Sequence, residues 1–293
     1  MMKEKDYQQL LPLRSLYAHK GDCGRVGLVA GSRSMLGAAI LASKAALRAG
    51  AGLVYLMTLP DVSAEIQAQC PELIVLPLLV SDAGFLLPES APMIRDYIQE
   101  YRFDAFGMGP GLGRSEDTYG LLTAVSSYWK EFSFCTLLDA DALYCLDIVL
   151  LRQALGQRFI LTPHVGEFRR LFSEEADIVF DSHIRQERCQ FWAADVDQVL
   201  VLKGANTVVS DGKRTQKNRT GGPALATAGT GDVLSGIILA LLAQGMLFYE
   251  AACLGVYLHG LAGDLVSEEK GPCLIASDVS DMLPKAWMKL SSL

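Results

Sequence analysis

The alternation of short apolar strands with helices is the feature that most restricts how this chain can fold. Residues 25–30 are an apolar run closed by Gly31, residues 35–48 are rich in Ala and Leu, and residues 53–58 are a second apolar run. We expect Ser32 or Ser34 to cap the intervening helix. Strand, helix and strand in succession imply two parallel strands joined by a helical crossover. The sequence therefore predicts an α/β fold with a parallel sheet.

The same pattern recurs along the chain. Strands are predicted at residues 103–108, 132–138, 159–161 and 199–202, a hairpin around Asp211-Gly212, and helices at residues 115–129, 142–155, 232–243, 249–267 and 277–287. Glycine and polar residues follow the strands, at the edge where open α/β sheets bind ligands. We expect a leader, residues 1–19, that packs on one domain, residues 20–293.

Composition excludes several classes of protein. The net charge of −7 argues against nucleic-acid binding. The longest apolar run, residues 233–246, is shorter than the roughly 20 residues of a membrane span. The N-terminus is polar and shows no signal peptide, and none of the seven cysteines forms a CxxC pair. We expect free thiols and a cytoplasmic protein that binds neither nucleic acid nor membrane.

The segment from Gly229 to Asp232 is the most informative motif. Its small residues precede an apolar helix, so bare backbone N–H groups and the helix N-terminus can form an anion hole for a phosphate. An aspartate beside that hole is suited to take a proton from a hydroxyl that attacks a phosphoryl group. The alternative is that Asp232 only caps the helix.

The run GMGPGLG, from Gly107 to Gly113, does not match the dinucleotide fingerprint, because Leu112 stands where its third glycine would be. We interpret it as a loop that lets a substrate approach the backbone, with a structural turn as the alternative. The motifs GxSxG, HExxH and GxxxxGK[ST] are absent, which argues against serine hydrolase, zincin and P-loop chemistry.

Two further strand ends carry polar side chains. In TPHVGE, Glu167 could hold Mg²⁺ directly or through water, and His164 could bond a substrate; helix-start charge compensation and a satisfied loop histidine are the alternatives. In KGANT, Lys203 and the backbone at Gly204 could contact a nucleotide, or Lys203 could simply open a hairpin.

Two other segments are weaker candidates. In LDADAL, Asp139 and Asp141 could assist metal or substrate binding, and a capping role is an equal alternative for Asp141. The small side chains of Ala38 and Ala39 could face a ligand ring or permit close helix packing.

Taken in order, the segments KGDCGRVGLVAGS, GMGPGLG, LDADAL, LTPHVGEF, VLKGANT, ATAGTGDVLSGII and VYLHGLAGD resemble the ADP/ATP-dependent NAD(P)H-hydrate dehydratases, a carbohydrate-kinase-like family. The resemblance runs from about Lys20 to Pro284. It implies a ribokinase-like three-layer α/β/α sandwich with a mostly parallel central sheet. It also implies ADP or ATP as co-substrate, Mg²⁺, the hydrates NADHX and NADPHX as substrates, and a homo-oligomer, expected to be a tetramer.

The resemblance also implies roles for particular residues. The nucleotide site would comprise Lys203, Gly204, Ala205, Asn206, Thr207 and Gly231. The hydrated dinucleotide would contact Ala38, Ala39, Gly109, His164 and Asp232. Asp232 would act as the base, with Gly229, Thr230 and Gly231 supplying N–H groups, and Glu167 would bind the metal.

The implied reaction returns the S-epimer of the hydrate to NADH or NADPH by phosphorylating its C6 hydroxyl and eliminating phosphate, with ADP expected as the donor. One departure is Gly222, where the family usually has Asn. Family members often carry an N-terminal epimerase domain, and we expect this chain to lack it. The alternatives are a small-molecule kinase of the same fold, of the hydroxyethylthiazole or pyridoxal type, and an inactive nucleotide sensor.

Overall fold

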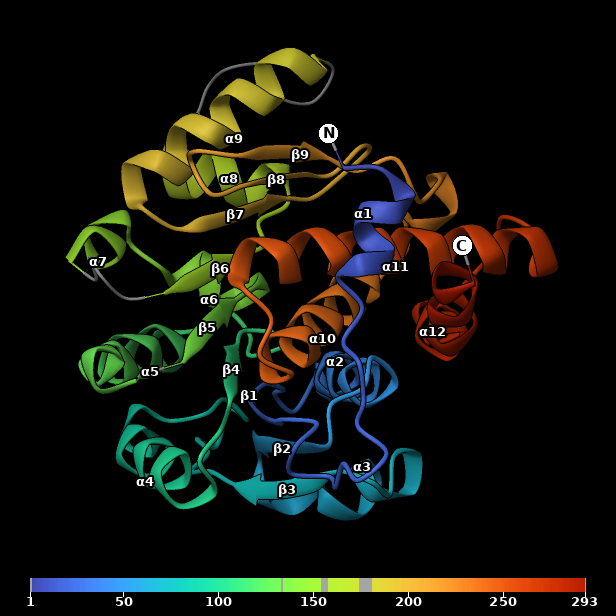
Figure 1. The fold of residues 1–293 in the computed structure, drawn as a ribbon. Coiled ribbons are helices and arrows are strands. Elements are labelled where there is room, and N and C mark those ends of the chain that lie inside the picture. Colours follow the sequence, from blue (N-terminus) through green and yellow to red (C-terminus); the bar gives the residue numbers. More distant parts are fainter. Residues whose placement is uncertain (1, 133, 154–157, 174–180, 293) are drawn as a thin grey trace.

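A nine-stranded sheet forms the centre of the computed structural model, which describes residues 2–132, 134–153, 158–173 and 181–292 (Figure 1). Its strand order is β3-β2-β1-β4-β5-β6-β7-β8-β9. The strands are β1 Arg25–Val29, β2 Leu53–Thr58, β3 Ile74–Pro77, β4 Ala105–Met108, β5 Cys135–Leu138, β6 Phe159–Leu161, β7 Val199–Leu202, β8 Val208–Ser210 and β9 Thr215–Lys217. Strands β1 to β7 are parallel, and the hairpin β8–β9 adds antiparallel strands at one edge. The mostly parallel sheet predicted from the sequence is confirmed.

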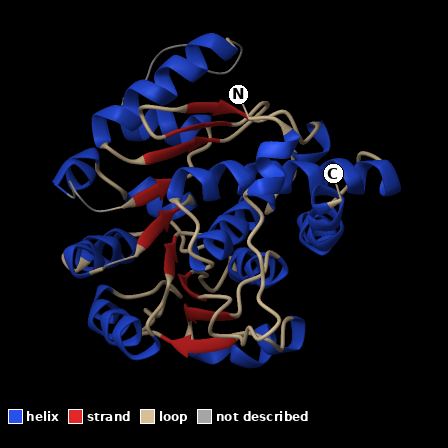
Figure 2. Ribbon diagram, viewed as in Figure 1, coloured by secondary structure: helices blue, strands red, loops and turns tan. Residues whose placement is uncertain are grey.

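Helices cover both faces of the sheet (Figure 2). The α-helices are α1 Glu4–Gln9, α2 Leu36–Arg48, α3 Ser63–Gln69, α4 Ala91–Tyr101, α5 Glu116–Ser126, α6 Ala140–Cys145, α7 Ile148–Gln153, α8 Val165–Phe172, α9 Ser182–Val196, α10 Thr230–Ala243, α11 Phe248–Lys270 and α12 Ala276–Ser291. Short 3₁₀ turns lie at Pro60–Val62, Pro88–Ser90, Trp129–Glu131 and Pro223–Leu225.

Two separate apolar cores lie on the two faces of the sheet. One core joins the sheet to α2, α3, α10, α11 and α12, and the other joins it to α4, α5, α6, α7, α8 and α9. Strand residues alternate between the cores because successive side chains of a strand point to opposite faces: Leu28 belongs to the first core and Val29 to the second. The expected three-layer α/β/α arrangement is therefore confirmed.

The helix α10 lies unusually close to α2. A side-chain carbon at Gly236 would stand 2.0 Å from the carbonyl oxygen of Ala42, so only glycine allows this approach. The contact fixes the position of α10, whose first turn carries the Gly229–Asp232 motif.

The segment before β1 packs on the same side of the molecule as the C-terminal helix (Figure 1). Tyr7 of α1 is buried, and its ring stacks on that of Tyr257 with centroids 4.1 Å apart. Gln8 donates to the backbone carbonyl of Ser291 in α12 at 3.1 Å. None of the helices that the structure describes is long and apolar enough to span a membrane.

Two local predictions are wrong. The single helix expected at residues 142–155 is two helices, α6 and α7, within its described part, since residues 154 and 155 lie outside the described residues. Leu146 has extended backbone and a buried side chain, and the Asp147 carboxylate accepts from the Val149 N–H at 2.8 Å to start α7. Neither Ser32 nor Ser34 caps α2: the helix begins after Met35 without a side-chain cap.

Candidate active site

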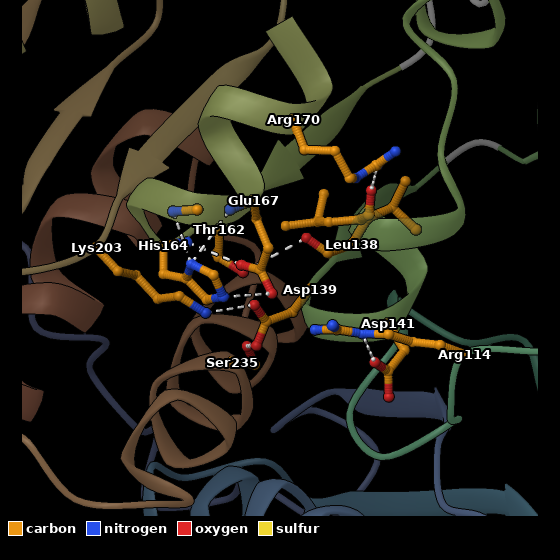
Figure 3. Close-up of polar contacts among 12 residues, drawn as sticks. Arg114, Leu138, Asp139, Asp141, Thr162, His164, Glu167, Arg170, Lys203 and Ser235 are labelled. Carbon is orange, nitrogen blue, oxygen red and sulfur yellow. Dashed lines mark hydrogen bonds and ion pairs between the residues drawn. The ribbon is translucent and has the colours of Figure 1, made fainter. Parts of the chain in front are cut away.

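The C-terminal ends of the strands β4, β5, β6 and β7 meet at one edge of the sheet, opposite the first turn of α10. Asp139 follows β5, His164 lies just beyond β6, and Lys203 follows β7 (Figure 3). The Lys203 N–H donates to the carbonyl of Pro163 at 2.8 Å, which joins the TPHVGE and KGANT loops. Residues far apart in sequence are thereby brought together.

Lys203 is held by a buried carboxylate. Its Nζ lies 2.6 Å from Oδ1 of Asp139, whose Oδ2 accepts from the Ser235 hydroxyl at 2.7 Å. Asp139 is only 1% exposed. Burial alone would raise the pKa of Asp139, but the charge and hydrogen bond of Lys203, together with Ser235, lower it. Burial likewise opposes a charged Lys203, yet the carboxylates of Asp139 and Glu167 raise its pKa. The pair is therefore an ion pair at neutral pH.

Asp232 is the third residue of α10 and does not cap it. The N-cap is Gly229, in the left-handed region at φ 87°, and the Thr230 hydroxyl donates to the carbonyls of Leu225 at 2.9 Å and Thr227 at 3.0 Å. Burial, and after it the charge of Asp139, raise the pKa of Asp232 to about 7 against the opposing charge of Lys203. A carboxylate with a pKa near neutrality is suited to accept a proton during catalysis.

The first turn of α10 also provides an anion site. The first N–H groups of a helix have no acceptor within the helix, and its N-terminus carries partial positive charge. A side-chain carbon at Gly231 would stand 3.4 Å from Lys203 Nζ, so the ammonium lies directly beside these N–H groups. Two sources of positive potential, the helix N-terminus and the Lys203 ammonium, therefore converge next to Asp232.

His164 and Glu167 form a reciprocal cap at the start of α8. The His164 Nδ1 accepts from the N–H groups of Gly166 at 3.0 Å and Glu167 at 3.2 Å. The Glu167 carboxylate accepts from the His164 N–H at 2.8 Å, and its other oxygen lies 3.3 Å from His164 Nε2. Burial lowers the pKa of His164, and burial raises the pKa of Glu167 to about 7. The alternatives stated for these residues are therefore observed: Glu167 interacts at the start of the helix, and the hydrogen bonds of His164 are satisfied by its neighbours.

The remaining residues of KGANT lie at the surface of the same edge. Gly204, Ala205 and Asn206 are exposed, and Asn206 adopts a left-handed backbone at φ 53°. The Thr207 hydroxyl donates to the Gly204 carbonyl at 3.0 Å, which closes the turn. This exposed turn beside Lys203 leaves its backbone accessible to a ligand.

The small residues predicted to contact substrate differ in accessibility. Ala38 is partly exposed and lies against the GMGPGLG loop, because a side-chain carbon at Gly111 would stand 2.9 Å from its Cβ. Ala39 is fully buried in the core. Gly109 is buried too, and a side-chain carbon there would meet the Asp139 carbonyl at 1.8 Å. Of the two alanines, only Ala38 presents its side chain toward the site.

Asp141 does not cap the helix α6, whose N-cap is Asp139. The Asp141 carboxylate accepts from the Gly113 N–H at 2.9 Å and from Arg114 Nε at 3.1 Å (Figure 3). The capping prediction for Asp141 is wrong, because its side chain turns toward the GMGPGLG loop. Ser235 and Arg114 were not predicted; Ser235 follows Asp232 by one helical turn, a spacing that places both on one face of α10.

Gly222, the departure from the family pattern, lies exposed in the loop before α10. The atom closest to a side-chain carbon placed there would be an Asp264 carboxylate oxygen, at 3.9 Å. The other Asp264 oxygen accepts from the Gly221 N–H at 2.9 Å. The position therefore has room for a larger side chain.

Comparison with known proteins identifies the family of this chain. The family model of NAD(P)H-hydrate dehydratase matches residues 26–285. The chain belongs to the NAD(P)H-hydrate dehydratase family. The ADP-dependent (S)-NAD(P)H-hydrate dehydratase of Cenarchaeum symbiosum is 34% identical over 97% of this chain and 95% of its own length.

Other members of the NAD(P)H-hydrate dehydratase family are longer. The bifunctional NAD(P)H-hydrate repair enzyme Nnr of Moorella thermoacetica is 38% identical over 94% of this chain but only 51% of its own length. The chain thus spans about half the length of such relatives.

The fold of the family is confirmed by solved structures. The ADP/ATP-dependent NAD(P)H-hydrate dehydratase of Bacillus subtilis, co-crystallized with ATP/Mg²⁺, superposes with a TM-score of 0.83 at 32% identity, over 98% of this chain and 97% of that one. A ribokinase-like superfamily protein of Enterococcus faecalis superposes with a TM-score of 0.81 at 26% identity, over 100% of this chain and 96% of that one. The predicted ribokinase-like fold is therefore confirmed.

Proposed function

We propose that this chain uses ADP or ATP to dehydrate the S-epimer of NADHX and NADPHX, which restores NADH and NADPH. The observation that carries the proposal is Asp232, a carboxyl with a pKa raised by burial to about 7, beside the helix N-terminus and Lys203. The names of relatives from Cenarchaeum symbiosum and Bacillus subtilis support the same substrates and co-substrates.

The two substrates would approach from different sides of Asp139. The exposed turn of Gly204–Thr207 and Lys203 would bind the nucleotide, whose terminal phosphate reaches the N–H groups of Gly229, Thr230 and Gly231. The hydrated nicotinamide ring would lie between Ala38, Gly109 and His164, with its C6 hydroxyl at Asp232. Neutral His164 would carry its proton on Nε2, because its Nδ1 already accepts two hydrogen bonds, and this N–H would be shared between Glu167, 3.3 Å away, and an acceptor of the substrate.

The chemistry proceeds in two steps. Asp232 takes the proton of the C6 hydroxyl as that oxygen bonds to the terminal phosphorus, and the bond from phosphorus to the nucleotide breaks. Lys203 and the α10 N–H groups stabilise the charge in transfer. The lone pair of the ring nitrogen then expels phosphate from C6, and a C5 proton passes to water as the double bond is restored. The nucleotide is left one phosphate shorter.

The side chains present fit a magnesium ion held chiefly by the nucleotide. No cluster of three or more metal-ligating side chains occurs among the described residues, and Mg²⁺ typically uses one or two carboxylates with phosphate oxygens and water. Both Glu167 oxygens lie close to His164 nitrogens, so Glu167 would act on the ion through water. When bound, the ion would neutralise phosphate charge.

The test is incubation of the protein with NADHX, Mg²⁺ and either ADP or ATP, followed by absorbance at the NADH band and mass spectrometry of the products. We expect NADH, orthophosphate and AMP from ADP, or ADP from ATP, with ADP the better donor. A stable phosphorylated dinucleotide would indicate a kinase instead. Nucleotide binding without any turnover would indicate a sensor.

A further inference from the structure

Arg185 is a buried cation directly beneath the exposed turn of Gly204–Thr207. It lies in the first turn of α9, which packs on β7 and β8 (Figure 1). Only 4% of the residue is exposed. A side-chain carbon at Gly204 would stand 2.8 Å from Nη2 and 3.1 Å from Nη1 of Arg185. The guanidinium therefore forms the floor on which the start of the turn lies.

Arg185 also fixes the backbone from which this turn begins. Its Nη2 donates to the carbonyls of Leu202 at 2.9 Å and Lys203 at 2.6 Å. The N–H of Lys203 is engaged as well, because it donates to the Pro163 carbonyl at 2.8 Å. Both backbone groups of Lys203 are thus held, one of them by the guanidinium.

No carboxylate balances the charge of Arg185 in the part of the chain that the structure describes. Its hydrogen bonds there go to the two carbonyls, and its Nε has no partner. Cys189 is the one described titratable group whose charge acts on Arg185, and burial raises the pKa of that thiol to about 12, so it is neutral near pH 7. Burial lowers the pKa of Arg185, but a guanidinium stays protonated at neutral pH. Arg185 is therefore a buried positive charge without a counterion among the described residues.

The turn above Arg185 presents N–H groups to solvent. Gly204 has φ 137° and Asn206 has φ 53°, and the turn is fixed at its far end by the Asn218 N–H, which donates to the Thr207 carbonyl at 2.8 Å. Within the described ranges, the N–H groups of Ala205 and Asn206 have no hydrogen-bond acceptor. Successive N–H groups in a turn with left-handed residues form a concavity that binds anions. The donors above and the charge below thus favour the same kind of ligand.

The electrostatic consequence is a preference for a ligand that carries phosphate. A buried charge without a counterion is costly, and the two carbonyl dipoles offset only part of that cost. An anion over the turn supplies the opposite charge, and its attraction to Arg185 acts through protein of low dielectric. Arg185 therefore strengthens the binding of an anion more than that of an uncharged molecule.

We propose that Arg185 is a positioning residue of the nucleotide site, which holds the Gly204–Thr207 turn in its binding conformation and whose charge strengthens the binding of the nucleotide phosphates. The inference rests on the proposed function and adds a determinant of ADP or ATP affinity to it. Arg185 acts through the backbone of Leu202, Lys203 and Gly204 and does not touch the reacting atoms. The hydrated dinucleotide, on the other side of Asp139, should not depend on it.

The experiment measures ADP affinity by calorimetric titration of the intact protein, and the KM values for ADP and NADHX separately. Arg185→Gln should raise the Kd and the KM for ADP about tenfold to a hundredfold, with kcat at saturating ADP and the KM for NADHX unchanged. Arg185→Lys keeps the charge but loses the planar fork of donors, so its ADP affinity should lie between those of Arg185→Gln and wild type.

A matched control is Val196→Ala. Val196 is fully buried at the other end of the same helix, α9. Its truncation should lower the temperature of unfolding, because it removes buried methyl groups, and should leave both KM values unchanged. The control separates a loss of stability in α9 from a loss of ADP affinity. Thermal unfolding of each variant verifies that it is folded.

Each outcome supports or overturns the role of Arg185. Wild-type ADP affinity in both Arg185 variants, or an equal rise in the KM values for ADP and NADHX, would overturn it and leave the proposed function intact. If Arg185→Gln does not fold, the same comparison on Arg185→Lys decides. Failure of the unaltered protein to bind ADP would overturn the proposed function and the role of Arg185 with it.

Discussion

At the scale of single residues, the ammonium group of Lys203 interacts electrostatically with three carboxyl groups. Lys203 forms a close ion pair with Asp139, while burial raises the pKa of both Asp232 and Glu167 to about 7. The charge of Asp139 therefore keeps Lys203 protonated and raises the proton affinity of Asp232. The structure thus separates a fixed ion pair from a carboxyl that can exchange its proton near neutral pH.

Lys203→Ala should both weaken ADP binding and destabilise the protein. Removal of one partner leaves Asp139 as a buried unpaired charge, which costs about 3–5 kcal/mol. The double variant Lys203→Met with Asp139→Asn should recover most of this stability but still bind ADP about tenfold to a hundredfold more weakly. Calorimetric titration and thermal unfolding measure the two effects, and wild-type ADP affinity in the double variant would exclude Lys203 from the nucleotide site.

Asp232→Asn should reduce turnover by about 10²–10⁴ and retain ADP binding.

The same substitution should also stabilise the protein in a pH-dependent way. Burial raises the pKa of Asp232 from 3.8 to about 7, so between these values the folded protein holds a proton that the unfolded chain has lost. Wild-type stability therefore falls as pH rises through this window, whereas Asn has no proton to lose.

The stability difference between Asp232→Asn and wild type should grow from pH 4 to pH 7 and then level off, with a gain on the order of 1–4 kcal/mol. Denaturant unfolding at pH 4, 6 and 8 measures it. A difference that does not change with pH would mean that Asp232 ionises normally in the folded protein.

Sequence reasoning located most of these residues because polar residues at strand ends and a GTGD motif before an apolar helix are local signals. It could not pair Lys203 with Asp139, which lie 64 positions apart. Ser235 carries no motif of its own, and its role depends on which face of α10 turns toward β5. Arg114 was missed because its ion pair with Asp141 joins two segments that lie 27 positions apart.

At the scale of elements, the close packing of α10 on α2 sets the position of the anion site. Gly236→Val should destabilise the protein by about 1–3 kcal/mol or more, since the added carbons meet the Ala42 carbonyl. It should also lower turnover, because α10 carries Asp232. Gly37→Ala is the control: nothing lies within 4 Å of a side-chain carbon there, and alanine favours the helix. Equal stability of Gly236→Val and wild type would show that the two helices can separate freely.

The elements predicted most accurately are those made of apolar residues throughout, such as β2 and β6. Their predicted bounds are the same as those in the structure. Prediction failed where tertiary contacts decide. Strand β3 lies at the edge of the sheet beside β2 and ends on an exposed Pro77, so its run of apolar residues is short. The break between α6 and α7 arises because Leu146 turns into the core, which helical periodicity does not reveal.

At the scale of the whole molecule, the parallel sheet explains how the site is assembled. Asp139, His164 and Lys203 follow consecutive strands, so they meet at one edge although many residues separate them. The fold alone does not determine the chemistry: the hydroxyethylthiazole kinase of Pyrococcus horikoshii superposes with a TM-score of 0.60 at 15% identity, which is a likeness of fold alone. The chemistry must therefore be tested on the substrate itself.

The most direct measurement follows the fate of the C6 oxygen during turnover. NADHX labelled with ¹⁸O in its C6 hydroxyl is converted in the presence of Mg²⁺ and unlabelled ADP, and the orthophosphate is analysed by mass spectrometry. Phosphorylation of the hydroxyl followed by elimination predicts one ¹⁸O atom in each orthophosphate formed, with NADH unlabelled. Label released into water, with unlabelled orthophosphate, would contradict phosphoryl transfer to the hydroxyl and the role of Asp232 as its base.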